Sequence, residues 1–368
     1  MPMTIMGTGQ ALPAAIIDKH AALVLARSLS NGTDEQESWL AAIYENSGIN
    51  TRRFCLGPEV VKDVIEGTDH THSAFLPTRL PGERGPSTAE RMEHYAEFAP
   101  DLATAAARNA LEQSGLKPTD ITHVVTVSCT GFLAPGIDFT LIENLRLDRD
   151  VARTHVGYMG CHGALNGLRV AQAFADADSN SRVLMCAVEL SCLHYYYGWD
   201  PQKVIANSLF ADGAAALIAM QTDAGTTPAW QMLASGAHIF PDSNSAMTWT
   251  IGDYGFEMTL SKQVPMLIEQ ELRPWLKDWL GSHGLVLDDI RSWAVHPGGP
   301  KILDGVAAAL NLHADQLAES RAVLAEFGNM SSPTILFILE RLRAEHAPCP
   351  CVALAFGPGL VVEAALFK

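Results

Sequence analysis

The sequence predicts an α/β protein in which layers of helices and sheet alternate, built from two duplicated halves. Three observations support this prediction: a length and composition suited to a large core, helical and strand-like patterns that alternate, and one pattern that occurs twice. The chain has 368 residues, of which 48% are hydrophobic and 18% are charged. These values are ordinary for a globular protein, and the length allows two domains or one large double domain. Alternating helices and strands are typical of layered α/β folds.

The repeated pattern is carried by three segments in the same order. GLKPTDITHVVTV begins at Gly115 and GLVLDDIRSWAVH begins at Gly284, an offset of 169 residues (284 minus 115). The same offset relates the region YMGCHGALNGLRV to EFGNMSSPTILFI, with Gly160 on Asn329, and RVLMCAVEL to CVALAFGPG. Chance similarity of apolar strands is the alternative, and the shared Gly and Asp–Ile positions argue against it. The pattern therefore favours two copies of a helix–strand–loop–helix–strand unit.

The repeat divides the chain into two expected domains. We predict an N-terminal half over residues 1–222 and a C-terminal half over residues 223–368. The stretch from about residue 222 to 253 is rich in Gly, Pro, Ser and Thr. Such a composition is typical of loops, so this stretch is expected to join the halves.

Charge and cysteine content exclude several classes of function. The formal net charge of −16 argues against nonspecific binding to nucleic acid or to anionic membrane surfaces. An anionic substrate would need a local basic site. The first residues lack the pattern of a signal peptide, and no apolar run approaches the roughly 18 residues that span a bilayer. Seven cysteines, an odd number, fit a reduced cytoplasmic protein.

One cysteine lies where its thiol could be reactive. Cys161 follows the apolar stretch 154–159 and precedes a segment, LNGLRVAQAFADA, with apolar residues at helical spacing. A thiol at a strand-to-helix corner lies at the positive end of the helix dipole, which favours the nucleophilic thiolate. The alternative is a small buried residue at a tight corner.

The duplication suggests partners for this cysteine. Asn329 occupies the matching corner of the second copy, and His296 ends its β run before the turn HPGGP. If the halves pack together, Cys161, His296 and Asn329 can face one another across the interface. Taken singly, the histidine could be structural and the asparagine could cap the following helix. Their joint placement with a cysteine favours a catalytic role.

Other candidate ligands have simpler explanations. His70 and His72, in DHTHS, are expected on a surface loop and not at a metal site. Cys55, Cys186 and Cys192 are interpreted as small apolar residues.

The motifs from about residue 90 to the end resemble a known family. GYMGCHGALNG, NSLFADGAAALI, AVHPGGPKIL, EFGNMSSPTI and AFGPGLVVEAALF are similar, in the same order, to motifs of the thiolase-fold condensing enzymes. Within that fold they resemble the type III polyketide synthases, the chalcone synthase-like family. The resemblance implies a thiolase-like layered αβαβα fold.

The family resemblance also implies a role for each residue of the triad. Cys161 would be the nucleophile that carries the acyl group from an acyl-CoA starter, because a thiolate both attacks and leaves a thioester well. His296, as imidazolium, would keep that thiol ionised. His296 and Asn329 would donate to the oxygen on which charge develops when malonyl-CoA loses carbon dioxide. No metal or organic cofactor is expected.

Substrate-binding positions follow from the same resemblance. Phe210 matches an aromatic gatekeeper, and the second gatekeeper falls on Met258, which is flexible; an aliphatic starter is therefore expected. The other positions implied in the acyl pocket are Cys129, Ala134, His194 and Ser331. Ala134 matches a loop that reaches into the partner subunit of a homodimer. The basic residues that grip coenzyme A in plant members have no evident match, so the candidates are Arg52, Arg53, Lys301 and Gly299. Acyl-carrier-protein thioesters stay open as substrates.

Three functions remain open at this stage. The first is iterative extension of an acyl-CoA starter with malonyl units and cyclisation to a pyrone- or resorcinol-type product. The second is a single condensation, as in ketoacyl synthase III-like or hydroxymethylglutaryl-CoA synthase-like acyltransferases. The third is a non-catalytic member of the fold that binds an acyl ligand. The motifs HPGGP and AFGPG favour the first, and the intact triad argues against the third.

Overall fold

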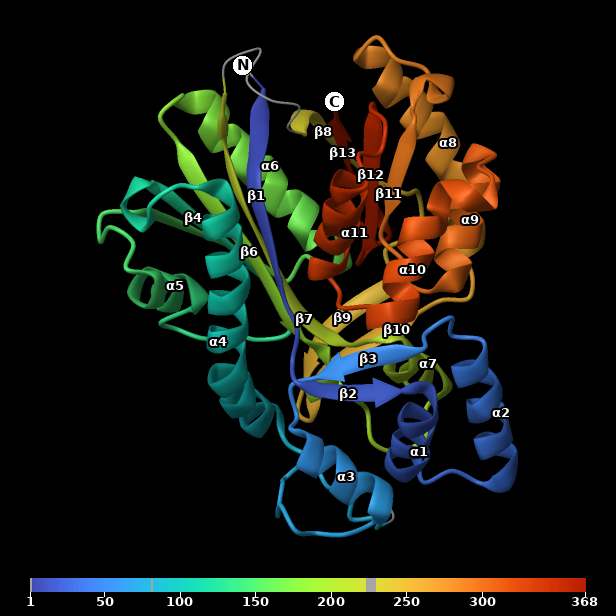
Figure 1. Ribbon diagram of the computed structural model, residues 1–368. Coiled ribbons are helices and arrows are strands. Elements are labelled where there is room, and N and C mark those ends of the chain that lie inside the picture. Colours follow the sequence, from blue (N-terminus) through green and yellow to red (C-terminus); the bar gives the residue numbers. More distant parts are fainter. Residues whose placement is uncertain (1, 81, 223–229) are drawn as a thin grey trace.

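The computed structural model describes residues 2–80, 82–222 and 230–368 and contains a nine-stranded sheet (Figure 1). In spatial order its strands are β11 (Ser292–Val295), β12 (Cys351–Gly357), β13 (Val361–Phe367), β8 (Gln231–Ile239), β1 (Met3–Ala11), β7 (Asp212–Gln221), β6 (Arg182–Leu190), β4 (His123–Ser128) and β5 (Ala152–Gly157). Strand β1 pairs along its length with β7 but meets β8 only at Met3 and Thr4. This short junction lets the two parts of the sheet diverge and leaves room for helices between them.

Helices cover both faces of each part of the sheet. One outer layer consists of α4 (Thr88–Ser114) and α5 (Ile137–Leu145). The central layer consists of α6 (Gly163–Ala177) and α11 (Pro333–Ala344). The other outer layer consists of α8 (Val264–Ser282) and α9 (Pro300–Leu310). Helix α10 (Ala318–Phe327) packs beside α11. The resulting order of helix, sheet, helix, sheet, helix confirms the predicted layered fold (Figure 1).

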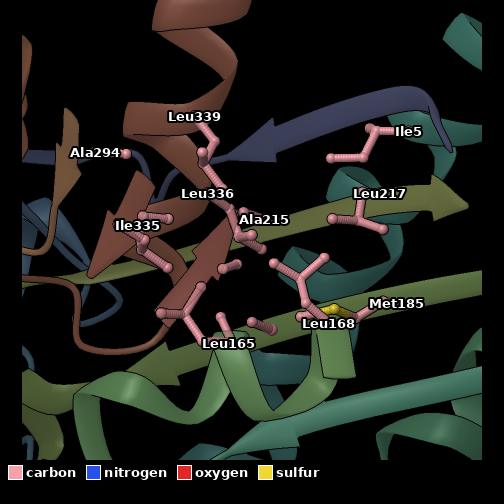
Figure 2. Close-up of a cluster of buried hydrophobic side chains, with 14 of the residues drawn as sticks. Ile5, Leu165, Leu168, Met185, Ala215, Leu217, Ala294, Ile335, Leu336 and Leu339 are labelled. Carbon is pink, nitrogen blue, oxygen red and sulfur yellow. The ribbon is translucent and has the colours of Figure 1, made fainter. Parts of the chain in front are cut away.

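The central helices form the core that holds the two halves together. Leu165 and Leu168 of α6 and Ile335, Leu336 and Leu339 of α11 pack against side chains of the sheet, and all are at most 5% exposed (Figure 2). Both helices are apolar over a wide face because each is covered by strands and by the other helix. Fully burying one such side chain contributes about 1.5–3 kcal/mol.

The predicted duplication is present in the element pattern. The starts of β4 and β11 are 169 residues apart (292 minus 123), those of α6 and α11 are 170 apart (333 minus 163), and those of β6 and β12 are 169 apart (351 minus 182). The two units therefore share one framework of strand, central helix and strand.

The stretch expected to join the halves is largely folded, so that prediction is wrong over its described part. It contains β8 and also β9 (Met247–Gly252), which pairs with β10 (Gly255–Leu260) in a hairpin. Residues 223–229 lie outside the described residues. The small residues of β8 serve packing: a Cβ at Gly236 would lie 2.5 Å from Nε1 of Trp279, so glycine lets α8 approach the sheet closely.

A smaller group of elements, the N-terminal cap, lies at one end of the main sheet next to the β9–β10 hairpin (Figure 1). It consists of β2 (Ala15–Asp18), β3 (Thr51–Phe54), α1 (Lys19–Ser30), α2 (Asp34–Glu45) and α3 (Pro58–Glu66), and packs on α7 (Pro201–Leu209). Asp18 and Thr33 accept backbone N–H bonds at the starts of α1 and α2, as N-cap residues do. No helix within the described ranges is both long and apolar enough to cross a membrane. His70 and His72 are exposed, as expected for a surface loop.

Candidate active site

Cys161 lies at the predicted corner between β5 and α6. The chain turns through Tyr158 and Gly160, whose φ angles are +62° and +74°, and Cys161 follows in a single turn of 3-10 helix, Gly160–His162. The cysteine is 7% exposed. Its thiol is therefore at the start of α6, as the sequence predicts.

The second half of the chain closes over this corner. A Cβ added to Gly160 would lie 2.3 Å from Cδ of Pro358, in the turn that links β12 to β13. Only glycine fits, both because of this contact and because of its positive φ. The AFGPG segment thus packs directly on the corner that presents Cys161.

His296 brings a buried imidazole with free polar atoms. Its backbone N–H donates to the carbonyl oxygen of Leu354 at 2.8 Å, which extends the pairing of β11 with β12. The residue is 1% exposed, and neither ring nitrogen has a hydrogen-bond partner among the described residues. Buried polar atoms without partners are uncommon and costly. This imidazole is therefore suited to receiving a ligand.

Asn329 is held by both its backbone and its side chain. Its N–H donates to the carbonyl oxygen of Leu209 and its own carbonyl accepts from Ala211, each at 2.9 Å, so that Phe210 and Asn329 form a β-bridge. Oδ1 accepts from the N–H of Ser331 at 2.8 Å. Its Nδ2 donates to the carbonyl oxygen of Gly298 at 3.4 Å, and the amide lowers the pKa of the Cys161 thiol, so it belongs to the same site as the thiol. It does not cap α11.

Burial keeps both reactive groups neutral. It raises the pKa of the Cys161 thiol to about 11, although hydrogen bonds from Ser331 and Asn329 oppose the rise. Burial, together with nearby His162, lowers the pKa of His296 to about 3. Burial therefore favours the neutral form of each group, whereas the thiolate–imidazolium pair stays a prediction from the family resemblance. The physical reason is that a charge of either sign is poorly solvated there.

A buried carboxylate that the sequence analysis missed organises the rim of the site. Glu189, at the end of β6, accepts hydrogen bonds from the N–H of Cys129 at 2.9 Å, from Oγ1 of Thr130 at 2.7 Å and from Oγ of Ser332 at 2.6 Å. It thereby ties β4 to the start of α11. Burial raises the pKa of Glu189 to about 7. A glutamate inside an apolar strand pattern was the available signal, because such a residue must find partners.

The pocket beside Cys161 is narrow. It is lined by Cys129, Thr130, Gly160, Cys161, Ser191, Phe210, Met247, Thr248, Trp249, Met258, Ser331 and Pro358, and its volume is about 30 Å³. A second space of about 30 Å³ shares Phe210, Trp249 and Met258 with the first and continues to His194. Ligand pockets usually exceed about 300 Å³. An acyl chain therefore requires these side chains to move.

Trp249 is the main difference from the predicted pocket. It lies opposite Met258 in the β9–β10 hairpin, and its Nε1 donates to the carbonyl oxygen of Cys129 at 2.8 Å. An aromatic side chain therefore accompanies Phe210, supplied by β9 and not by β10. The pocket therefore contains a second aromatic ring, which the assignment of the second gatekeeper to Met258 did not predict.

His194 lies in the second space but has no free polar atom. Nε2 donates to the carbonyl oxygen of Thr130 at 2.7 Å, and Nδ1 accepts from the N–H of Phe256 at 3.0 Å. Its ring stacks on that of Phe256, with centroids 4.2 Å apart. Burial lowers the pKa of His194 to about 3, so the ring is a neutral wall of the space.

Ala134 does not line the pocket within its own chain. It is exposed on the loop that leads to α5, in contrast to Cys129 and Ser331.

The candidate coenzyme A residues have different surroundings. Arg52 is 2% exposed, and its guanidinium donates to the carbonyl oxygens of Asn207, Ser208 and Phe210. The prediction that it binds phosphate is therefore wrong: all of these bonds point inward, and Arg52 instead supports the segment that carries Phe210. Lys301 is exposed at the start of α9, two residues after Gly299, and Arg53 is half-buried and donates to the carbonyl oxygen of Pro13.

The fold and the site define a condensing-enzyme class, in which a cysteine at a helix start faces donors from a second, duplicated half. Comparison with known proteins agrees. Residues 2–223 match the model of the N-terminal domain of chalcone and stilbene synthases, and residues 231–368 match the C-terminal domain. The alpha-pyrone synthesis polyketide synthase-like Pks18 of Mycobacterium tuberculosis is 31% identical over 99% of this chain and 90% of its own length. Bisdemethoxycurcumin synthase of Oryza sativa is 35% identical over 86% of this chain and 82% of its length.

Solved structures extend the similarity to the whole fold. PKS-I of the brown alga Ectocarpus siliculosus superposes with a TM-score of 0.90 at 31% identity, covering 100% of this chain and 98% of that one. The C-terminal type III polyketide synthase domain of Steely1 from Dictyostelium gives 0.88 at 26% identity, covering 100% and 99%. The chain belongs to the chalcone and stilbene synthase family, the type III polyketide synthases.

Proposed function

We propose that the protein loads an acyl group from an acyl-CoA onto Cys161, extends it by repeated decarboxylative condensation with malonyl-CoA and cyclises the product to a pyrone or a resorcinol-type ring. A relative with a pyrone product in its name, Pks18, supports the pyrone. The 1,3,6,8-tetrahydroxynaphthalene synthase of Streptomyces peucetius is 36% identical over 73% of this chain and supports ring closure of a polyketide.

Loading couples attack by the Cys161 thiol to transfer of its proton. The sulfur of Cys161 attacks the thioester carbonyl as its proton passes to a ring nitrogen of His296. His296 then gives that proton to the coenzyme A sulfur, which leaves as the thiol, and the imidazole is neutral again. The high pKa of the thiol means that this transfer occurs together with attack and not before it. Hydrogen bonds from Ser331 and Asn329 to the sulfur ease the loss of the proton.

Extension relies on the two donors from the C-terminal half. Malonyl-CoA loses carbon dioxide, and the electron pair of the broken C–C bond moves onto the thioester oxygen as an enolate. The N–H of neutral His296 and the amide of Asn329 stabilise that oxygen. The enolate carbon then attacks the acyl group on Cys161 and releases the thiolate, which can be loaded again.

The observation that carries this proposal is the imidazole of His296, which is 1% exposed and has no hydrogen-bond partner on either nitrogen within the described part of the chain. A neutral imidazole has one donor and one acceptor. The donor suits a thioester oxygen and the acceptor suits the thiol proton. No metal or cofactor is needed for these steps.

The substrates, partners and location are part of the same proposal. An aliphatic starter of modest length fits the narrow space between Phe210, Trp249 and Met258 best. Coenzyme A phosphates would contact Lys301 and Arg53, with Gly299 beside them; an acyl-carrier-protein thioester is the other source of the same acyl group. Exposed Phe132 and Leu133, next to Ala134, support a homodimer. The proposed halves are 1–222 and 223–368, and seven unpaired thiols support a cytoplasmic location.

The test is a product mass spectrum after incubation with malonyl-CoA and a panel of acyl-CoA starters. Pyrone or resorcinol masses that contain two or more malonyl-derived units are expected. A product extended only once would show a single-condensation enzyme and overturn iteration. If free starters fail but the same acyl group on a carrier protein is extended, the carrier assignment is corrected and the chemistry is kept.

A further inference from the structure

Outside the pocket, two thiols and a carboxylate converge from three separate segments. Cys55 follows β3, Cys192 lies in the turn after β6, and Asp212 begins β7. The two Sγ atoms are 3.5 Å apart, and Sγ of Cys192 donates to Oδ2 of Asp212 at 2.7 Å. All three ligand atoms lie within 4.8 Å of one another. The sequence analysis interpreted both cysteines as small apolar residues and missed this cluster.

The carboxylate of Asp212 is fixed so that it faces the thiols. Its Oδ2 accepts from the N–H of Cys55 at 2.7 Å and its Oδ1 accepts from the N–H of Cys192 at 2.8 Å. The backbone of each cysteine therefore holds the carboxylate against its own side chain. Cys192 and Asp212 are buried, and Cys55 is partly exposed, which leaves a route from solvent.

We infer that Cys55, Cys192 and Asp212 form a binding site for a thiolate-seeking divalent cation, with Zn²⁺ as the ion of best fit. Cysteine sulfur and carboxylate oxygen are both ordinary zinc ligands. Two thiolates on one tetrahedral zinc ion, with bonds of about 2.3 Å, are about 3.8 Å apart. The observed 3.5 Å is close to that separation.

The charge of the buried cluster is compatible with a dication. Binding replaces two thiol protons by Zn²⁺, which releases two H⁺ and leaves the net charge of the buried cluster unchanged. Two arginines lie nearby and have no acidic partner among the described residues: Arg52 bonds to the hydroxyl of Tyr195, and Arg91 bonds to the carbonyl oxygens of Leu193 and Tyr195. Both guanidiniums are at most 2% exposed. The cluster has a net charge of −1 both with two thiols and with two thiolates and Zn²⁺, so these two positive charges stabilise both states alike.

A disulfide between the same cysteines is the competing state. A disulfide would engage only the two sulfur atoms, whereas a metal ion would bind both sulfur atoms and the carboxylate.

The experiment uses the full-length protein, stripped with a chelator, reloaded with two equivalents of ZnCl₂ and desalted before metal analysis. About one Zn²⁺ per chain is expected in the wild type, in Cys161→Ala and in the matched control Cys349→Ser, whose thiol is also partly exposed. Cys55→Ser and Cys192→Ser should each retain less than about a tenth of that amount. Asp212→Asn keeps the shape of the side chain and should weaken binding about tenfold or more.

Three results would overturn the site. One is no retained zinc in folded wild type, and another is equal zinc in Cys55→Ser, a substitution at the partly exposed position that the fold should tolerate. The third is an intact mass 2 Da below that of the reduced chain, with the mass difference mapped to a Cys55–Cys192 peptide pair. Each of these can be distinguished from failure of the proposed condensation, because Cys161→Ala is expected to lose condensation but to bind zinc.

Discussion

The two halves share a framework of strands and helices but differ at the positions of the three candidate catalytic residues. At the common offset of 169, Cys161 corresponds to Met330, and His296 corresponds to Val127. Met330 and Val127 are both fully buried apolar residues. Gly160 corresponds to Asn329 at the same corner. Each reactive residue therefore has an inert counterpart in the other half.

This asymmetry follows from packing at the interface. The corners of both halves meet at a single place, where Pro358 contacts Gly160 and Phe210 pairs with Asn329. One place needs one nucleophile and one set of donors. The equivalent positions in the other half point into the core, where a thiol or an imidazole would cost free energy without a partner. Duplication supplies the frame, and the interface selects which copy holds each group.

The largest expected effect concerns the nucleophile of the N-terminal half. Cys161→Ala should reduce acyl loading and product formation about 10³-fold or more, because the other thiol of the pocket, Cys129, is buried and its sulfur is held by the N–H of Gly160 at 2.9 Å. Intact-protein mass spectra after incubation with an acyl-CoA measure the loading. Cys349→Ala is the matched control and should load like the wild type. Wild-type loading of Cys161→Ala would mean that Cys161 is not the nucleophile.

The next effect concerns the donor of the C-terminal half. Asn329→Asp keeps an acceptor for the N–H of Ser331 but removes the amide donor and adds charge opposite the enolate. Release of carbon dioxide from malonyl-CoA should fall about 10²-fold or more, while acyl loading should remain measurable. Asn311→Gly, at the exposed left-handed end of α9, is a control that should change neither rate. Unchanged decarboxylation would remove Asn329 from the site.

The pH dependence of Cys161 alkylation distinguishes a neutral thiol from a thiolate–imidazolium pair. The pKa of Cys161 is about 11, so the thiolate fraction should rise about tenfold for each pH unit between 7 and 9. Site-resolved alkylation by iodoacetamide should rise by the same factor. Ser331→Ala removes a hydrogen bond that lowers this pKa and should slow alkylation. A rate that is already constant above pH 7 would instead indicate a thiolate–imidazolium pair.

The smallest effect concerns the β9–β10 hairpin, which lines the pocket from the C-terminal half. Trp249→Ala should enlarge the space beside Cys161 and raise the relative rate with long acyl-CoA starters about tenfold. Trp39→Ala, a partly exposed position on α2, is the control. Initial rates over a chain-length series measure the change. No shift in preference would show that Trp249 does not limit the starter.

The sequence alone determined the layered α/β class, the duplication and the corner that carries Cys161, because these depend on local periodicity and on a repeat that survives in the residue order. It could not determine the protonation of Cys161 and His296, since the pKa of each depends on burial by distant segments. Nor could the sequence predict that Arg52 points inward. Arg52 and Arg53 are neighbours on β3 and point to opposite sides, and only packing decides which side faces the interior.

The tertiary structure alone decided the contents of the pocket and the second cluster. Trp249 reaches the pocket because β9 pairs with β10 and places it across from Met258. Cys55, Cys192 and Asp212 are separated by up to 157 residues in the chain, yet their backbones and side chains are hydrogen bonded. Periodicity fixes which face a residue takes within its own element, whereas contacts between elements depend on how strands order in the sheet and how layers pack on them.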